Sequence, residues 1–243
     1  MKRLLAPLTL FAALAAPATA SAKIVELGSA IPKTAVSCPD NCQALTRVTA
    51  YQGRGGSVLK PYVIPRAGKV IAFTVRLGTP NDAQQKFFQN SYGTKPQVQL
   101  SILKREATKG KKKYDHTVLA QSDAFDVSTF FGSAPTFTFD KALPVAKGNI
   151  VALTVPTWAP VFAAGLDRNH WWRSSRPKST KSCKDVAQNA QITKLNTTKT
   201  FGCTYFNTRL YYTATYVPDN KPTTATKKSA AASSKGPSTA KGA

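Results

Sequence analysis

Residues 69–77 read KVIAFTVRL, and this stretch decides the fold class of the 243-residue chain. Its apolar residues Ile71, Phe73, Val75 and Leu77 occupy every second position. Side chains alternate between the two faces of a β-strand, so this spacing predicts a strand with one apolar face. The same alternation recurs in four later runs, at residues 98–102, 137–139, 151–155 and 210–216.

Turn-forming sequences separate these runs, namely PRAG at 65–68, GTP at 78–80 and AKGN at 146–149. Strand patterns at 44–51 and 57–64, with weaker ones at 113–121 and 125–131, bring the predicted total to about nine short strands. Many short strands with turns between them indicate an all-β fold, an antiparallel sandwich or barrel.

Few segments favour helix. Asn81 is placed to cap one short helix that runs to Gln89, with Phe87 and Phe88 anchoring it to a sheet. Residues 185–190 predict one or two further helical turns. No regular alternation of strands and helices is present, which argues against Rossmann-type and TIM-type folds.

The first 22 residues have the order of a secretory signal. Lys2 and Arg3 precede an apolar run at 4–16, and small-residue cleavage patterns follow at 18–22. The run is short for a membrane span, which needs about 20 residues. We therefore expect a secreted protein with no membrane span, either released or held at the cell wall. Residues 23–37 form a mature N-terminal segment, 38–217 the folded domain, and 218–243 a disordered basic tail.

The charge of the chain favours anionic partners. Its 34 Lys and Arg residues against 11 Asp and Glu give a formal charge of +23, which falls by only two when the signal is removed. Nucleic acid, anionic lipid and acidic wall polymers are the candidate partners, and solubility alone is the alternative. Export argues against a specific nucleic-acid target and shifts the expectation to an anionic cell-wall polymer or polysaccharide.

Four cysteines follow the signal: Cys38, Cys42, Cys183 and Cys203. An even count in an exported chain predicts disulfides, and three pairings are possible. The local scheme, Cys38–Cys42 with Cys183–Cys203, is the first choice. A zinc site needs two closely spaced pairs, and the second pair is too widely separated. Calcium needs clustered carboxylates, which this basic chain lacks, so we expect neither a metal nor a cofactor.

Several segments resemble secreted, functionally uncharacterised proteins of actinobacterial type. They are Ser37-Cys38-Pro39 with Cys42, TRVTAYQ at 46–52, YVIPRAGKV at 62–70, PQVQLSIL at 96–103 and LPVAKGNI at 143–150. The resemblance spans residues 37–217 and implies a jelly-roll-like β-sandwich. It implies no activity, because it carries no catalytic motif.

An aromatic and basic segment at 167–184 is the first candidate binding site. It reads as a loop and holds Trp171 and Trp172 among the basic residues Arg168, His170, Arg173 and Arg176. Aromatic faces interleaved with cations stack on sugar rings or bases while they bind anions. The alternative is that one or both tryptophans cover the end of the sandwich core.

A basic stretch, KREATKGKKK at 104–113, is the second candidate. It reads as the loop of an extended hairpin, and its cations are Lys104, Arg105, Lys109, Lys111, Lys112 and Lys113. Such a loop can hold phosphates or wall polymers by charge. It can equally be a solvated loop whose lysines protect a sheet edge from aggregation.

Catalytic patterns are weak. Asp115 and His116 are neighbours in a predicted strand and therefore point to opposite faces. Asp167 and His170 are spaced to meet, but no nucleophile motif such as G-x-S-x-G accompanies them. Asp123 and Asp126 are the closest carboxylate pair for a glycosidase, with no cleft indicated around them.

Three functions are therefore considered. The preferred one is a secreted, non-enzymatic sandwich that associates with an anionic extracellular surface or wall polysaccharide. The second is an extracellular polysaccharide hydrolase, which requires a cleft with two carboxylates or a histidine–carboxylate pair. The third is a structural or protein-interaction module with no small ligand.

Overall fold

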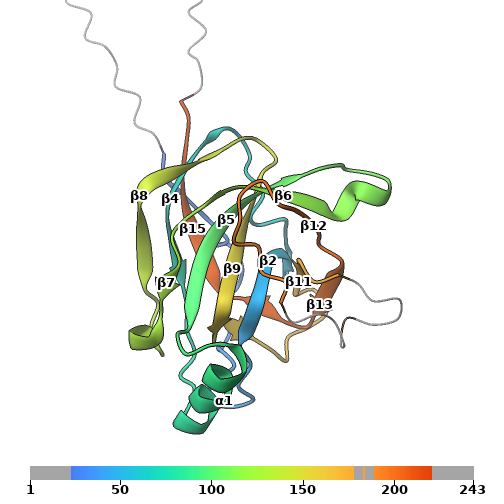
Figure 1. Ribbon diagram of the computed structural model, residues 1–243. Coiled ribbons are helices and arrows are strands. Elements are labelled where there is room, and N and C mark those ends of the chain that lie inside the picture. Colours follow the sequence, from blue (N-terminus) through green and yellow to red (C-terminus); the bar gives the residue numbers. More distant parts are fainter. Residues whose placement is uncertain (1–22, 178–182, 184–188, 221–243) are drawn as a thin grey trace, which may run out of the picture.

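The computed structural model describes residues 23–177, 183 and 189–220. Two antiparallel sheets pack face to face as a sandwich (Figure 1), which confirms the predicted all-β class. Within the described residues there are fifteen strands, one α-helix and two short 3-10 helices. The predicted signal at 1–22, the tail from 221 onward and most of the predicted turn at 185–190 lie outside these residues.

The smaller sheet has four strands in the order β1-β15-β4-β8. Their bounds are Val25–Leu27 for β1, Tyr212–Pro218 for β15, Gly68–Val75 for β4 and Thr136–Val145 for β8.

The larger sheet has the order β12-β6-β5-β9-β2-β11-β13. Its strands are β12 (Thr198–Thr200), β6 (Asp115–Gln121), β5 (Gln97–Arg105), β9 (Ile150–Ala159), β2 (Leu45–Gly55), β11 (Trp171–Ser174) and β13 (Cys203–Phe206). Short strands β3 (Val58–Leu59) and β7 (Phe125–Asp126) pair with β2 and β5, and β10 (Phe162–Ala163) pairs with β14 (Arg209–Leu210). The 3-10 helices are η1 (Lys111–Tyr114) and η2 (Ser128–Phe130).

Eight of these strands have jelly-roll topology. When β1, β2, β4, β5, β6, β8, β9 and β15 are numbered one to eight, the sheets read 1-8-3-6 and 2-7-4-5. This is the strand order of a double Greek key. The jelly-roll-like sandwich is therefore present, and β11 and β13 extend its larger sheet beyond β2.

The core lies between the sheets, and a second apolar cluster covers the outer face of the larger sheet. Val151, Leu153 and Val155 of β9 face the main core, as their alternation predicts. The intervening residues Ile150 and Ala152 are also buried, in the outer cluster with Phe201. The predicted strand at 151–155 is thus buried on both faces rather than one.

A β-bulge modifies the pattern at 69–77. Phe73, Val75 and Leu77 are fully buried as predicted, but Ile71 is only partly buried. Residues Thr215 and Tyr216 of β15 pair with Ala72 and Val70, so Ile71 is the extra residue of the bulge. The bulge resets the alternation, and Val70 is buried in place of Ile71.

Helix α1 (Asp82–Tyr92) begins at the predicted cap. Asn81 and Gln84 form a capping box, in which each side chain accepts from the other residue's backbone N–H. Phe88 is buried and stacks on Trp158 with ring centroids 5.1 Å apart. The prediction was wrong for Phe87, which is 59% exposed, because it lies on the other side of the helix.

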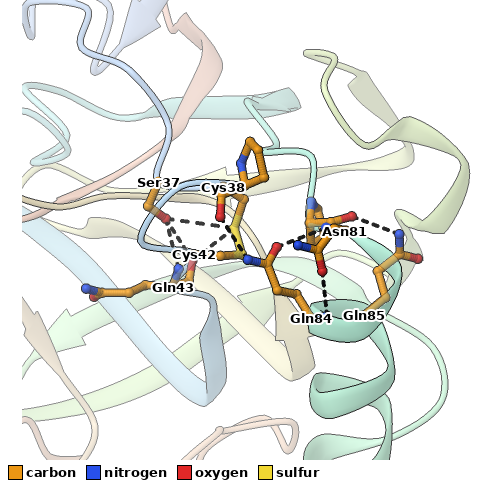
Figure 2. The surroundings of a disulfide bond; sticks show 9 residues. Ser37, Cys38, Cys42, Gln43, Asn81, Gln84 and Gln85 are labelled. Atoms are coloured by element: carbon orange, nitrogen blue, oxygen red, sulfur yellow. Dashed lines mark hydrogen bonds between the residues drawn. A yellow bond between two sulfur atoms is a disulfide. The ribbon is translucent and has the colours of Figure 1, made fainter.

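Both predicted disulfides are present, Cys38–Cys42 and Cys183–Cys203. Figure 2 shows the first beside the start of α1, where the Gln84 amide donates to the carbonyl of Pro39 at 2.8 Å. Ser37 closes the same loop, since its hydroxyl donates to the Gln43 carbonyl and accepts from the Gln43 N–H. Among the described residues, no helix is long and apolar enough to cross a membrane.

Candidate ligand-binding groove

The segment predicted as an aromatic and basic loop contains strand β11. It lies inside the larger sheet, with β2 on one side and β13 on the other. Neighbouring side chains of a strand point to opposite faces. Trp171 and Arg173 therefore face away from the core, whereas Trp172 and Ser174 face into it.

Trp172 is a core residue. It is 3% exposed and stacks on Tyr205 with ring centroids 4.4 Å apart. Its indole N–H donates to the Thr208 hydroxyl at 2.8 Å. An exposed tryptophan pair is therefore absent. One of the two tryptophans covers the core, as the alternative predicted, and Trp171 is the one available for stacking on a ligand.

Trp171 lies on the outer face against Gly53 of β2. A Cβ atom added to Gly53 would meet the Trp171 ring at 1.8 Å. The indole can therefore take this position only because residue 53 has no side chain. Trp171 stays partly exposed there.

The basic stretch at 104–113 joins β5 to β6, as predicted for a hairpin loop. Figure 1 shows this connection projecting beyond the sheet. Helix η1 at its end places Tyr114 beside Arg173, whose guanidinium lies 4.1 Å from the ring centroid. The Lys113 ammonium lies 4.9 Å from the same ring. This contact brings the two predicted binding segments together.

The two segments line one groove, formed by two adjoining pockets of about 250 and 340 Å³ that share five lining residues. We call it the cationic groove. Its charged residues are Lys60, Lys104, Arg105, Lys113, Lys147 and Arg173. Its rings are Tyr51, Tyr62, Tyr114 and Trp171.

The positive charge of the cationic groove is hardly neutralised by the protein. None of the described carboxylates lines either pocket. Within the described residues, the one ion pair of these cations is between Lys104 and Glu106, at 3.8 Å. Arg105 lines both pockets, and its Nε is shielded from solvent and has no hydrogen-bond partner in the part of the chain that the structure describes. An anion in the groove would compensate these charges.

The floor of the groove is neutral. Tyr51 is buried against Phe201 and His116. Burial lowers the pKa of His116 to about 4, although its bond to the Tyr114 carbonyl favours the charged form. At neutral pH its Nδ1–H donates to that carbonyl at 2.7 Å, which leaves Nε2 to accept from the Tyr51 hydroxyl at 3.4 Å.

The two groove phenols differ in acidity. Burial raises the pKa of Tyr51, with the charges of Arg173 and Arg105 acting in the opposite direction. A hydrogen bond with Lys113 lowers the pKa of Tyr114, and the nearby Arg173 charge contributes in the same direction. The Tyr51 hydroxyl is engaged with His116, so the exposed Tyr114 hydroxyl is the one that can donate a hydrogen bond to an anion.

Other predicted binding residues lie outside the groove. Arg168 is exposed and lies over the Phe206 ring at 5.0 Å. Arg176 is buried and donates to the Thr46 carbonyl at 2.9 Å, which gives it a role in the fold. Lys111 and Lys112 are exposed on η1 and do not line either pocket.

The predicted contact between His170 and Asp167 is present. The His170 Nδ1 lies 2.9 Å from the Asp167 carboxylate, which lowers the pKa of Asp167. Neither residue lines the cationic groove. Asp123 and Asp140 line a separate pocket of about 210 Å³, and both are exposed. The described residues contain no group of three or more His, Cys, Asp or Glu that could hold a metal ion.

Sequence reasoning did not find half of the groove. Tyr51, Lys60, Tyr62 and Lys147 read only as parts of strands and turns. The parity of β2 indicates that Tyr51 and Gly53 share a face, but only the pairing of β2 with β11 shows that Trp171 lies there.

Comparisons with protein-family models, with curated proteins and with solved structures found no match to this chain. The resemblance of residues 37–217 to secreted actinobacterial-type proteins stays a prediction. The function of the groove therefore has to be argued from its own residues.

Proposed function

We propose that this protein is a secreted, non-enzymatic jelly roll that binds an anionic extracellular polymer in the cationic groove. Wall polysaccharide or a teichoic-type polymer is the leading class of ligand. One observation carries the proposal: of the described residues, six cations and four aromatic rings line the same groove, and no carboxylate does.

The two kinds of side chain suit the two parts of such a polymer. Arginine and lysine bind phosphate or carboxylate groups, and arginine does so with paired N–H donors. The Trp171 ring, which lies against Gly53 and stays partly exposed, offers apolar surface for a sugar ring. Pockets of a few hundred Å³ accommodate a short segment of the polymer rather than a large cofactor.

The sequence and the disulfides support an extracellular location. Residues 1–22 have the order of an export signal. The two disulfides agree with an oxidising compartment. In that compartment the polyanions are lipids and wall polymers rather than intracellular nucleic acid.

Binding to purified cell wall and to poly(glycerol phosphate), at low and high salt, tests the proposal. We expect retention by both and an affinity that falls as salt screens the charges. Trp171→Ala and Arg173→Gln should each weaken binding about tenfold, as expected for the loss of one stacking or charge-assisted contact. Lys86→Gln on α1, an exposed lysine outside the groove, is the matched control and should bind like the wild type.

Two results would overturn the proposal. One is binding that is unchanged in both groove variants, which would leave the charge as a solubility feature. The other is release of shortened polymer during incubation, which would establish the hydrolase. In that case Asp123→Asn and Asp167→Asn would identify which carboxylate is needed.

A further inference from the structure

A second cationic pocket lies apart from the groove, between the segment that follows β1 and the adjoining ends of β4 and β15. It measures about 240 Å³ and shares no lining residue with the cationic groove. Its charged residues are Lys33, Arg76 and Arg209, with Tyr211 between the two arginines, and no carboxylate of the described ranges lines it.

Arg209 is the residue that points to a ligand. It is 3% exposed, so its guanidinium has lost nearly all contact with water. Its Nη1 donates to the carbonyl of Pro32, whereas its Nε is shielded from solvent and has no hydrogen-bond partner among residues 23–177, 183 and 189–220. Within the described residues no carboxylate forms an ion pair with it.

A buried charge of this kind is costly unless an opposite charge accompanies it. The neighbours of Arg209 supply only partial compensation. The Tyr211 ring centroid lies 4.3 Å from the guanidinium and attracts it through its π-face. Burial still lowers the pKa of Arg209 from its ordinary value, and the Arg76 charge acts in the same direction. The site is therefore short of negative charge.

The rest of the pocket is arranged for an anion. Arg76 is exposed and lies 5.9 Å from the centroid of the same Tyr211 ring. Lys33 is also exposed, so both side chains are free to approach a ligand. Tyr211 is held in place by a hydrogen bond between its hydroxyl and that of Thr34 at 2.7 Å. Two guanidinium groups and one ammonium group thus surround a volume large enough for a tetrahedral oxyanion.

We propose that this pocket binds a phosphate-type dianion, as inorganic phosphate or as a phosphate monoester. Three cations favour a doubly charged ligand over a monoanion. The paired N–H donors of each arginine guanidinium match the spacing of two phosphate oxygens. This site does not depend on the function proposed for the cationic groove.

Titration calorimetry of the disulfide-bonded protein with inorganic phosphate, glycerol phosphate and acetate, at constant ionic strength, tests the proposal. We expect saturable phosphate binding that Arg76→Gln weakens, and negligible heat with acetate. Phosphate should also raise the melting temperature. Saturable binding of glycerol phosphate, without saturable binding of inorganic phosphate, would identify a phosphate monoester as the ligand.

Arg76→Gln is the principal variant because the side chain is exposed and its loss should leave the fold unchanged. It should weaken phosphate binding about tenfold, the effect of one charge-assisted contact. Lys86→Gln on α1, an exposed lysine that lines neither the groove nor this pocket, is the matched control and should bind phosphate like the wild type. Arg209→Gln should abolish the phosphate-dependent rise in melting temperature.

The proposal would be overturned if neither inorganic phosphate nor glycerol phosphate bound saturably. It would also be overturned if Arg76→Gln bound them with the affinity of the wild type. Equal affinity for acetate would show a general anion site instead. If Arg209→Gln fails to fold, the double variant Lys33→Gln and Arg76→Gln decides the matter, because both of its residues are exposed. Polymer binding in the groove is measured with other variants, so failure of either proposal is distinguishable from failure of the other.

Discussion

Gly53 shows how a single missing side chain shapes the groove. The Trp171 indole occupies the space where a Cβ of residue 53 would lie. Gly53→Ala should therefore displace the ring and weaken polymer binding about as much as Trp171→Ala does. The reason is steric, since the new methyl group cannot coexist with the present position of the indole.

A double-mutant cycle checks this mechanism through the binding affinity. If Gly53→Ala acts only by moving the indole, the variant that carries both changes should bind no worse than Trp171→Ala alone. Additive losses would show that Gly53 contributes to binding in another way.

His116 makes stability depend on pH. Its pKa is about 4 in the folded protein because burial disfavours the charged imidazole, against an ordinary value of 6.5. Between these values the unfolded chain binds more protons, so stability falls as pH falls from 6.5 toward 4 and changes little above pH 7. From pH 7 to pH 5 the loss from this residue should be about 2 kcal/mol.

Urea denaturation of the wild type and of His116→Gln at pH 7 and pH 5 measures this contribution. The variant is expected to be less stable at pH 7, because it loses ring contacts with Tyr51 and Phe201. Its difference in stability between the two pH values should nevertheless be smaller than that of the wild type. An equal difference in both proteins would show that other groups cause the pH dependence.

The two neighbouring tryptophans of strand β11 have different roles, because they lie on opposite faces of the sheet. Trp172 is packed against Tyr205 and Phe162, so Trp172→Ala should lower the free energy of unfolding by about 3–5 kcal/mol. Trp171→Ala should cost much less stability and instead weaken polymer binding. Thermal unfolding together with polymer affinity, measured for both variants, checks the prediction. The prediction is wrong if the two variants lose the same amount of stability and the same amount of polymer affinity.

The very short strand β11 could not be predicted from the sequence. An alternating pattern needs about four to eight residues to be recognised. β5, β9 and β15 have nine, ten and seven residues, and their inward positions were predicted correctly. β11 has only four residues, two of them tryptophan, so the segment read as a loop and the face of each ring could not be assigned. The bulge at Ile71 is likewise invisible in the spacing of residues 69–77.

At the scale of the whole molecule, composition and spacing were sufficient for the fold class but not for the site. The disulfide pairs are local in sequence, so their pairing could be predicted. The cationic groove joins residues 51–63, 104–114, 147–150 and 171–173, which meet because β5, β9, β2 and β11 are neighbours in the larger sheet. Such a site depends on sheet order, and sheet order is not contained in the periodicity of any one strand.

The high net charge of the molecule should affect polymer binding in a different way from the contacts inside the groove. Lys111 and Lys112 are exposed on the hairpin beside the groove but do not line it. Charges in that position attract a polyanion over distances of about 10 Å at 0.1 M salt without touching it when bound. Replacing both with Gln should slow association about threefold at low salt, as expected for weaker steering, and leave dissociation unchanged.

Surface plasmon resonance with immobilised poly(glycerol phosphate) at low and high salt separates the two effects. At high salt the rates of the Lys111→Gln and Lys112→Gln double variant should equal those of the wild type. Arg173→Gln, which removes a contact inside the groove, should accelerate dissociation at both salt concentrations. Faster dissociation of the double variant would mean that the polymer extends over η1, and the binding surface would then be larger than the two pockets. If both variants associated and dissociated at the rates of the wild type, electrostatic capture would be contradicted. The charges inside the groove and beside it would then affect neither association nor dissociation.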